Sequence, residues 1–338
     1  MPLYPFQQQI LDQTAAFNRV AYYLDMGLGK TFVGGEKAVQ LGAQSLLVVC
    51  QKSKIVDWVE HLVNVCGIDT YNLTYKDEFQ RFFQCATAEW IDGFSIPVAG
   101  VVNYDLIFRR PQFLNLENFT LMLDESSQIQ NEKAKRTKFI LKMNPLNVIL
   151  LSGTPTSGKY ENLWSQMHLL GWGISKELYN RQYVNWVKVE QDGFIHFVID
   201  KEEPYKNVDR LKKKMRDHGS VFMKTEECFD LPEQIFIPII VQKTKEYNTF
   251  RKKGLVTIDG VELVGDSTLT KRLYSRMLCG HYNKDKLQAF KDLASSTKDR
   301  LIVFYNFNEG LNALQRIAAE LERPVSQVNG HVKDLTAY

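Results

Sequence analysis

The sequence predicts an α/β fold in which helices cover a parallel sheet. Short β-branched and apolar runs alternate with longer helical patterns through the first half of the chain, and this alternation is typical of strands joined by helical crossovers. The runs are apolar along their length, as expected of strands that are buried on both faces. Five strands are expected, at residues 20–24, 45–50, 97–103, 119–124 and 147–152.

Helical patterns separate most of these strands. Apolar residues recur at three- and four-residue spacing after Gly29, from Ser53 to Leu62 and from Lys133 to Met143. We expect residues 1–156 to form the first lobe. Residues 157–230 are richer in aromatic side chains and predict a helical extension of that lobe, with a hairpin at Asp192-Gly193.

A second series of strand and helix patterns begins after residue 230. Its expected elements are strands at 234–241, 300–307 and 325–328, helices near 244–253 and 284–294, and a hairpin at 259–260. These are fewer strands than an average sheet contains. We therefore expect residues 231–338 to be the incomplete start of a second α/β lobe.

Composition sets limits without naming a function. A chain of 338 residues exceeds what one core usually organises, and 44% hydrophobic with 24% charged residues is ordinary for globular proteins. The formal charge of +3 does not by itself argue for a nucleic-acid partner. The five cysteines lack a paired short spacing and no apolar run is long enough to span a bilayer. We expect a reducing compartment, cytoplasmic or nuclear, and no secretion or membrane insertion.

The most specific motif is LDMGLGKT at residues 24–31, between an apolar strand and a helical pattern. Glycines let backbone N–H groups approach phosphate oxygens, and the next helix N-terminus favours negative charge. Lys30 is placed to reach the β- and γ-phosphates, and the Thr31 hydroxyl to ligate Mg²⁺. The general pattern has glycine where this chain has Leu24, so the match is to the GKT end, and a chance GKT turn is the alternative. The residues expected to bind nucleotide here are Met26, Gly27, Leu28, Gly29, Lys30 and Thr31.

An acidic pair, Asp124 and Glu125, ends another expected strand. Because the ends of parallel strands converge on one edge of a sheet, Asp124 is expected to face magnesium bound by Thr31, and Glu125 to orient or activate the attacking water. Alone, such a pair is more often a solvated turn or a helix start. Coupled to the phosphate loop, it predicts a site with Lys30, Asp124 and Glu125 as catalytic residues and Thr31 and Asp124 as Mg²⁺ ligands.

A third segment, LSGTPT at residues 151–156, also follows an apolar strand. By itself it would be a turn with a helix cap. As the third strand-end motif of one sheet, it predicts that Ser152, Gly153 and Thr154 sense the γ-phosphate through Glu125 and report its loss.

In this order, the motifs resemble those of superfamily-two motors of the Swi/Snf type over nearly the whole chain, from Leu3 to about Gly330. LYPFQQQ at 3–9 resembles the family's adenine-recognising segment, which implies Gln7 at the base edge. The resemblance implies RecA-like P-loop lobes, ATP and Mg²⁺ as cofactors, and DNA-dependent ATP hydrolysis that drives movement along double-stranded DNA without sequence specificity.

Three further segments are similar to the family's DNA-proximal elements. The residues that this similarity places near DNA are Lys52 and Ser53 in VVCQKSKIVDWVEH, Asn103 and Tyr104 in VVNYDL, and Asn306 in RLIVFYNFNEGLNAL. Ser127 occupies the histidine position of the family's DEAH-type box. The last two motifs, with the arginines that complete the ATP site, have no counterpart before Tyr338.

Two other functions stay open. An arginine supplied across the cleft contributes about 1000-fold or more to phosphoryl transfer, so its lack favours a nucleotide-dependent DNA-binding or partner-recruiting module with little turnover. A DNA-unwinding helicase or a motor subunit of a restriction system is the nearer alternative.

Overall fold

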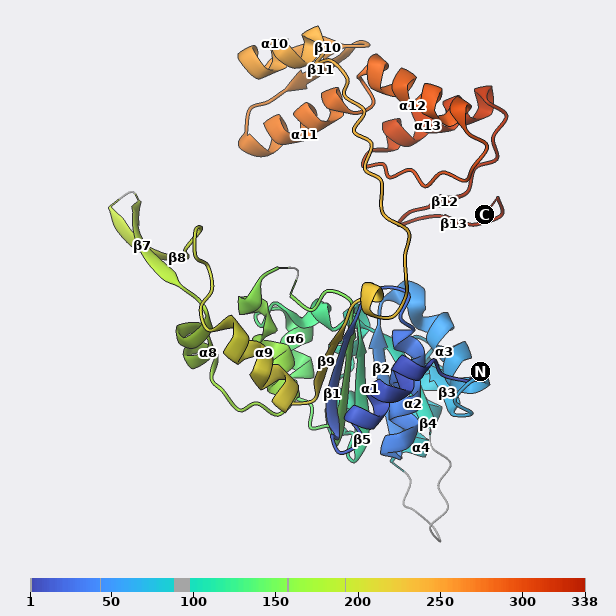
Figure 1. The fold of residues 1–338 in the computed structure, drawn as a ribbon, viewed down its shortest axis with the longest axis vertical. Helices are drawn as coiled ribbons and strands as arrows, with labels where there is room; N and C mark the ends of the chain where they lie inside the picture. Colours follow the sequence, from blue (N-terminus) through green and yellow to red (C-terminus); the bar gives the residue numbers. More distant parts are fainter. Residues whose placement is uncertain (1, 43, 88–97, 157, 192, 338) are drawn as a thin grey trace. The chain divides into compact units, whose positions relative to one another are not determined.

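The chain divides into two compact units, Met1–Pro232 and Glu233–Tyr338. The computed structural model describes all residues except 1, 43, 88–97, 157, 192 and 338 (Figure 1). Each unit is described by itself below.

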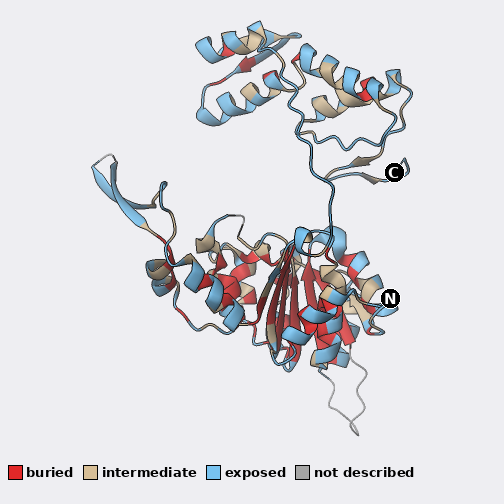
Figure 2. Ribbon diagram, in the orientation of Figure 1, coloured by how far each residue is buried: buried red, intermediate tan, exposed pale blue. Residues whose placement is uncertain are grey.

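Unit 1 is built on a seven-stranded parallel sheet with the order β3-β4-β2-β5-β6-β1-β9. Its five central strands are the predicted ones: β1 (Arg19–Leu24), β2 (Ser45–Cys50), β4 (Val98–Asn103), β5 (Phe119–Asp124) and β6 (Asn147–Ser152). These strands are buried almost throughout, as Figure 2 shows, because helices cover both faces. The predicted α/β class is confirmed, and Pro97, at the start of the third predicted strand, lies outside the described residues.

Two strands of the sheet were not predicted. They are β3 (Asp69–Asn72), at one edge, and β9 (Ser220–Met223), which pairs with Ala21–Leu24 of β1 at the other. The segment after residue 157 therefore contributes a strand to the first sheet. Gly219, just before β9, has φ +76°, and a Cβ there would lie 2.4 Å from the Arg19 carbonyl oxygen, so the close approach of the two edge strands requires glycine.

Helices pack on both faces of this sheet and divide its core into two layers. One layer contains α1 (Pro5–Gln13), α2 (Lys30–Leu41) and α3 (Ile55–Asn64), which follows the short 3₁₀ helix η1 (Lys52–Lys54). The other contains α4 (Lys76–Ala86), α5 (Tyr104–Ile107), η2 (Pro111–Asn115), η3 (Ser126–Ile129), α6 (Lys135–Ile140), η4 (Tyr160–Leu163), α7 (Trp164–Leu169), α8 (Lys176–Tyr183) and α9 (Val208–Asp217). The helix predicted over 133–143 is thus shorter than expected.

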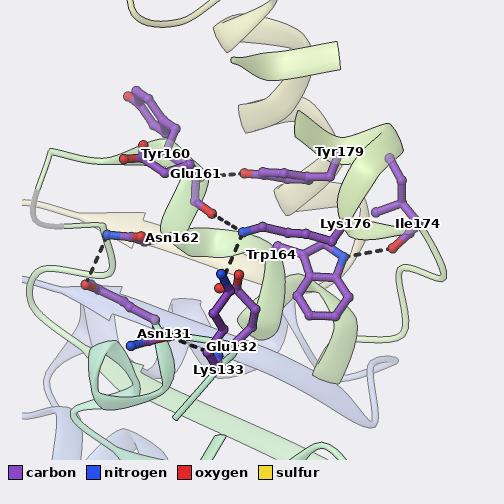
Figure 3. Close-up of polar contacts among 11 residues, drawn as sticks. Asn131, Glu132, Lys133, Tyr160, Glu161, Asn162, Trp164, Ile174, Lys176 and Tyr179 are labelled. Carbon is purple, nitrogen blue, oxygen red and sulfur yellow. Dashed lines mark hydrogen bonds and ion pairs between the residues drawn. The ribbon is translucent and has the colours of Figure 1, made fainter. Parts of the chain in front are cut away.

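Polar contacts connect the helices of the extension to one another, and one ion pair joins the extension to Glu132, as Figure 3 shows. The Lys176 amine donates to the Glu161 carbonyl oxygen at 2.7 Å and lies 3.8 Å from a Glu132 carboxylate oxygen. The Trp164 indole N–H donates to the Ile174 carbonyl oxygen at 2.9 Å. Beyond α8, β7 (Trp186–Gln191) and β8 (Phe194–Ile199) form an antiparallel hairpin at the expected position, and Gly193 in its turn has φ +75°.

Unit 2 is mainly helical. Its elements are α10 (Lys245–Lys253), β10 (Leu255–Ile258), β11 (Val261–Val264), α11 (Thr268–Cys279), α12 (Lys284–Ser296), α13 (Asn308–Glu320), β12 (Gln327–Val328) and β13 (Lys333–Asp334); the short η5 (Thr225–Glu227) precedes it in unit 1. The strands β10 and β11 form the hairpin predicted at Asp259-Gly260.

The strands predicted at 234–241 and 300–307 are wrong, because neither segment forms a strand in the structure. A strand of a sheet is held by hydrogen bonds to its neighbours. Within the described part of unit 2 the paired strands are β10 with β11 and β12 with β13, both antiparallel, and neither pair includes the two predicted segments. In both segments apolar side chains, such as Ile235 and Phe304, are exposed. The strand predicted at 325–328 is reduced to the two residues of β12.

No helix in the described residues is both long enough and apolar enough to cross a lipid bilayer.

Candidate nucleotide site

The glycine-containing loop connects β1 to α2, and its shape depends on glycine. Gly27 has φ +86°, and Gly29, the residue before α2, has φ +72°. A Cβ at Gly29 would lie 2.4 Å from Nε2 of Gln7. The left-handed backbone favours glycine at position 29, and a Cβ there would also displace the end of the Gln7 side chain.

Lys30 opens α2 and turns its amine back over the loop. Its Nζ donates to the Leu24 carbonyl oxygen at 2.9 Å and to the Asp25 carbonyl oxygen at 3.2 Å. Burial lowers the pKa of Lys30, and the charges of Glu125 and Asp124 oppose that shift. Lys30 and the acidic pair thus lie close enough to interact, and phosphate oxygens could replace the carbonyl groups as acceptors.

The acidic pair lies where β5 ends and the chain turns into η3. Glu125 has φ +52°, an uncommon left-handed conformation for a residue other than glycine. Its carboxylate accepts a long hydrogen bond of 3.5 Å from Ser152 Oγ. Burial, and then the charge of Asp124, raise the pKa of Glu125, while Lys30 and the Ser152 hydroxyl oppose the rise. A carboxylate with a raised pKa is a better proton acceptor than an ordinary glutamate.

Asp124 is hydrogen-bonded through both its side chain and its backbone. The Trp58 indole N–H donates to Asp124 Oδ2 at 2.9 Å, and the Tyr104 hydroxyl donates to the Asp124 carbonyl oxygen at 2.9 Å. Sequence reasoning missed both contacts, since they join residues that are far apart in the chain.

The oxygen donors present suit a magnesium ion. Thr31 in the first turn of α2 and the Asp124 carboxylate carry hard oxygen atoms, the kind of donor that Mg²⁺ prefers. In the part of the chain that the structure describes, no group of three or more His, Cys, Asp and Glu side chains could hold a metal ion. Binding of Mg²⁺ by Thr31 and Asp124 stays a prediction.

Gln7 is buried against the loop. Its Oε1 accepts from the Tyr4 backbone N–H at 3.0 Å, and its Nε2 donates to the Leu28 carbonyl oxygen at 3.0 Å. Both ends of the amide are thus used to hold α1 against the loop in this structure. Contact with the adenine edge stays a prediction.

A further contact that sequence reasoning missed comes from η5. The Thr225 backbone N–H donates to Asp25 Oδ2 at 3.1 Å. Because β9 pairs with β1, the residues that follow these two strands come together. Asp25 thereby ties the phosphate loop to the segment that leaves unit 1.

The third segment is linked to the acidic turn by the side chain of Gln166, which is fully buried on α7. Its Oε1 accepts from Ser126 Oγ at 2.8 Å and from the Tyr23 hydroxyl at 3.1 Å, and its Nε2 donates to the Pro155 carbonyl oxygen at 2.9 Å. Gln130 Nε2 donates to the same carbonyl at 3.0 Å. The sequence gives one indication of the role of Gln166, because it is a polar residue at a position where the helical pattern expects a buried apolar one.

Ser152 and Thr154 form a local turn beside this network. Ser152 is buried, and its Oγ accepts from the Thr154 backbone N–H at 3.2 Å. A Cβ at Gly153 would lie 3.6 Å from Lys30 Nζ. The structure thus brings the predicted coupling residues to Lys30 and Glu125, and their sensing role stays a prediction.

The residues predicted to contact DNA differ in exposure. Lys52 and Ser53 are exposed on η1, and Asn103 is half-buried at the start of α5. Tyr104 is only 4% exposed, which leaves little of it for DNA. Asn306, in unit 2, is exposed and accepts a hydrogen bond from Arg276 Nη2 at 2.9 Å. Their DNA contacts stay predictions.

The parallel sheet, with a glycine loop after β1 and an acidic pair after β5, defines a RecA-like P-loop lobe. The model of the SNF2-related domain matches residues 24–284, more than half of the chain. The chain belongs to this family.

Individual relatives agree with that assignment. The chain is 26% identical over 281 residues to helicase domino of Drosophila melanogaster, covering 77% of this chain and 8% of the relative. It is 21% identical over 356 residues to the ISWI chromatin-remodeling complex ATPase ISW1 of Saccharomyces cerevisiae, covering 93% and 30%. The chain therefore spans less than a third of the length of these relatives.

A solved structure shares the fold. The Sulfolobus solfataricus SWI2/SNF2 ATPase core in complex with dsDNA matches with a TM-score of 0.55 and 18% sequence identity, covering 98% of this chain and 73% of that one.

Proposed function

We propose that this chain is the motor core of a DNA-dependent ATPase that moves along double-stranded DNA. The observation that carries the proposal is the order β5-β6-β1 in the sheet. These neighbouring parallel strands end in the acidic pair, in Ser152 and in the phosphate loop. Three predicted motifs are therefore assembled at one edge, where open α/β sheets bind ligands.

Each residue at this edge has a distinct task in the proposal. Backbone N–H groups of the loop and the Lys30 amine bind the phosphates of ATP. Thr31 and Asp124 hold Mg²⁺, which neutralises charge on the phosphate oxygens. Glu125, with its raised pKa, orients the attacking water and accepts its proton.

Coupling between hydrolysis and movement would begin at the third segment. The Ser152 hydroxyl contacts Glu125, and Gln166 connects Ser126 to Pro155. Hydrogen bonds therefore connect the acidic turn to α7, and a structural change at the γ-phosphate could be transmitted along them. We propose that loss of the γ-phosphate shifts this route and moves the helical extension.

DNA binding is proposed through phosphate contacts. Lys52 and Ser53 are exposed and close in sequence to Trp58, whose indole N–H donates to Asp124. The archaeal ATPase core, which shares this fold, was solved in complex with dsDNA. Contacts to phosphates carry no direct sequence information and weaken steeply with salt. We also propose a reducing compartment, cytoplasmic or nuclear, because the five cysteines have no paired short spacing in the sequence.

Steady-state ATPase activity with and without duplex DNA tests the proposal, with Lys30→Ala as the control for contaminating activity. We expect nucleotide binding, turnover stimulated by duplex DNA more than by single-stranded DNA, and loss of both binding and turnover in Lys30→Ala. Stimulation by single strands alone would instead indicate an unwinding enzyme. Tight binding without any turnover would indicate a nucleotide-dependent clamp, and no affinity for ATP would refute the proposal.

A further inference from the structure

Two segments that are predicted to lie near DNA each contain an aromatic side chain that donates a hydrogen bond to Asp124. Strands β4, β2 and β5 are neighbours in the sheet. Tyr104 directly follows β4, Trp58 lies on the helix after β2, and Asp124 ends β5. The phenol donates to the Asp124 backbone and the indole to its carboxylate.

The Trp58 contact is well suited to orient a side chain. Trp58 is 2% exposed, and its indole has a single N–H that can only donate. Leaving that group buried without an acceptor would cost free energy, so the bond to Asp124 Oδ2 is favoured over other arrangements. The ring is also held by packing, with the His61 ring edge-on at 5.9 Å between centroids. The indole thereby restrains rotation of the Asp124 carboxylate.

Tyr104 supports the same residue from the backbone side. Its hydroxyl reaches the Asp124 carbonyl oxygen at 2.9 Å and the Glu125 carbonyl oxygen at 3.5 Å. The side chain is 4% exposed. Tyr104 therefore holds the turn in which Glu125 adopts its left-handed conformation.

Polar residues that are at least partly accessible to solvent precede both aromatic side chains in the chain. Lys52, Ser53 and Lys54 on η1 lead directly into α3, which carries Trp58. Asn103, half-buried, directly precedes Tyr104. Each element thus joins an accessible polar end to a buried aromatic donor that contacts Asp124.

We propose that Trp58 and Tyr104 are positioning residues that make the orientation of Asp124, and through it Mg²⁺ binding, respond to DNA. This inference rests on the proposed function and adds the physical link between the polynucleotide and the metal ligand. DNA phosphates held by η1 would fix the start of α3, and α3 would fix the indole against Asp124. Groups that orient a metal ligand commonly change metal affinity by about 10-fold or more when removed.

The test uses Trp58→Phe and Tyr104→Phe, which remove the donors and keep aromatic packing. Two matched controls are Trp172→Phe and Tyr183→Phe. Tyr183 is buried, and its hydroxyl has no hydrogen-bond partner among the residues that the structure describes. Equilibrium binding of a fluorescent ATP analogue is measured in EDTA and across a Mg²⁺ titration, with and without duplex DNA. This readout requires no turnover.

We expect Trp58→Phe to raise the Mg²⁺ concentration at half-saturation about 10-fold, with affinity in EDTA within about twofold of wild type. DNA should lower that Mg²⁺ concentration in the wild-type chain and in both controls, and much less in Trp58→Phe and Tyr104→Phe. Unchanged Mg²⁺ dependence and an unchanged DNA effect in both variants would overturn the inference. An equal loss of affinity in EDTA would overturn it too, because a general packing defect does not depend on the metal. Failure of the wild-type chain to bind the analogue at all would be recognised separately, as failure of the proposed function.

Discussion

Replacing Gln166 by leucine should destabilise unit 1 substantially, although the two side chains are similar in size. Gln166 is fully buried, and the substitution removes three hydrogen bonds of its side chain. The amide oxygen accepts from the hydroxyl groups of Tyr23 and Ser126, and the amide nitrogen donates to the Pro155 carbonyl oxygen. A typical intramolecular hydrogen bond contributes about 1 kcal/mol net, and a buried group left without its partner costs about 1–3 kcal/mol. The three lost bonds therefore predict a decrease of about 3 kcal/mol in the free energy of unfolding.

Urea unfolding followed by tryptophan fluorescence measures this decrease in the whole chain. All five tryptophans precede residue 232, so the signal reports unit 1. With a urea dependence of about 3 kcal/mol per molar, the midpoint should fall by about 1 M. The slope should stay unchanged if the folded state keeps its compactness.

A double-mutant cycle with Ser126→Ala sharpens the test. If Ser126 and Gln166 are partners, the second substitution should cost less in the Gln166→Leu background than in the wild-type chain, because the lost bond is counted once. A midpoint for Gln166→Leu within about 0.2 M of wild type, or strictly additive effects, would refute the reasoning.

Three further predictions concern the site and its controls. Glu125→Gln should lower turnover by about 100-fold or more. The same substitution should stabilise the chain at neutral pH. Because the pKa of Glu125 is raised in the folded chain, folding favours the protonated side chain, and this contribution to stability is lost as pH rises through the raised pKa. Urea midpoints from pH 4 to 8 should therefore show the advantage of the variant shrinking as pH falls, and an advantage that grows instead would contradict the cause assigned to the shift. Gly29→Ala should weaken nucleotide binding, because alanine is strained at φ +72° and the loop would have to change its shape. Nucleotide affinity near wild type in a titration would contradict this reasoning. Tyr183→Phe should leave the urea midpoint unchanged or slightly higher, because the buried hydroxyl has no hydrogen-bond partner in the described part of the chain. A loss of stability above about 1 kcal/mol would show that the hydroxyl has a partner.

The sequence predicted the centre of unit 1 well, because buried parallel strands carry a strong local signal. Segments such as SLLVVC and NVILLS are apolar along their length, and each became a central strand. The edge strand Asp69–Asn72 was missed because its residues, DTYN, are polar and half-exposed. Ser220–Met223 was missed because four residues after a glycine give too short a pattern.

The wrong strands in unit 2 have the opposite cause. QIFIPIIV and RLIVFYNF have the composition of buried strands, but composition does not supply a neighbour, and a strand forms only when another strand accepts its hydrogen bonds. The local sequence therefore predicts the tendency of a segment to form a strand, but it does not determine whether another strand pairs with it.

The candidate site shows the same division between local and distant information. Lys30, Thr31 and the acidic pair were predicted to share a site because each lies at or after the end of a strand, and the topology of a parallel sheet brings such positions to one edge. The contacts of Trp58 with Asp124, of Gln166 with Ser126 and of Thr225 with Asp25 join residues from different parts of the chain. One sequence without aligned relatives contains no signal for such pairs.

The bond between Thr225 and Asp25 has a mechanical consequence. Thr225 lies only a few residues before the end of unit 1, in the stretch through which any tension between the two units must pass. Nearer to the end of unit 1, Phe229 packs edge-on against the rings of Tyr4 and Phe6. Asp25 is also one of the two residues whose carbonyl oxygens accept from the Lys30 amine. A displacement of Thr225 would therefore act on Asp25, and through Asp25 on the setting of the Lys30 amine.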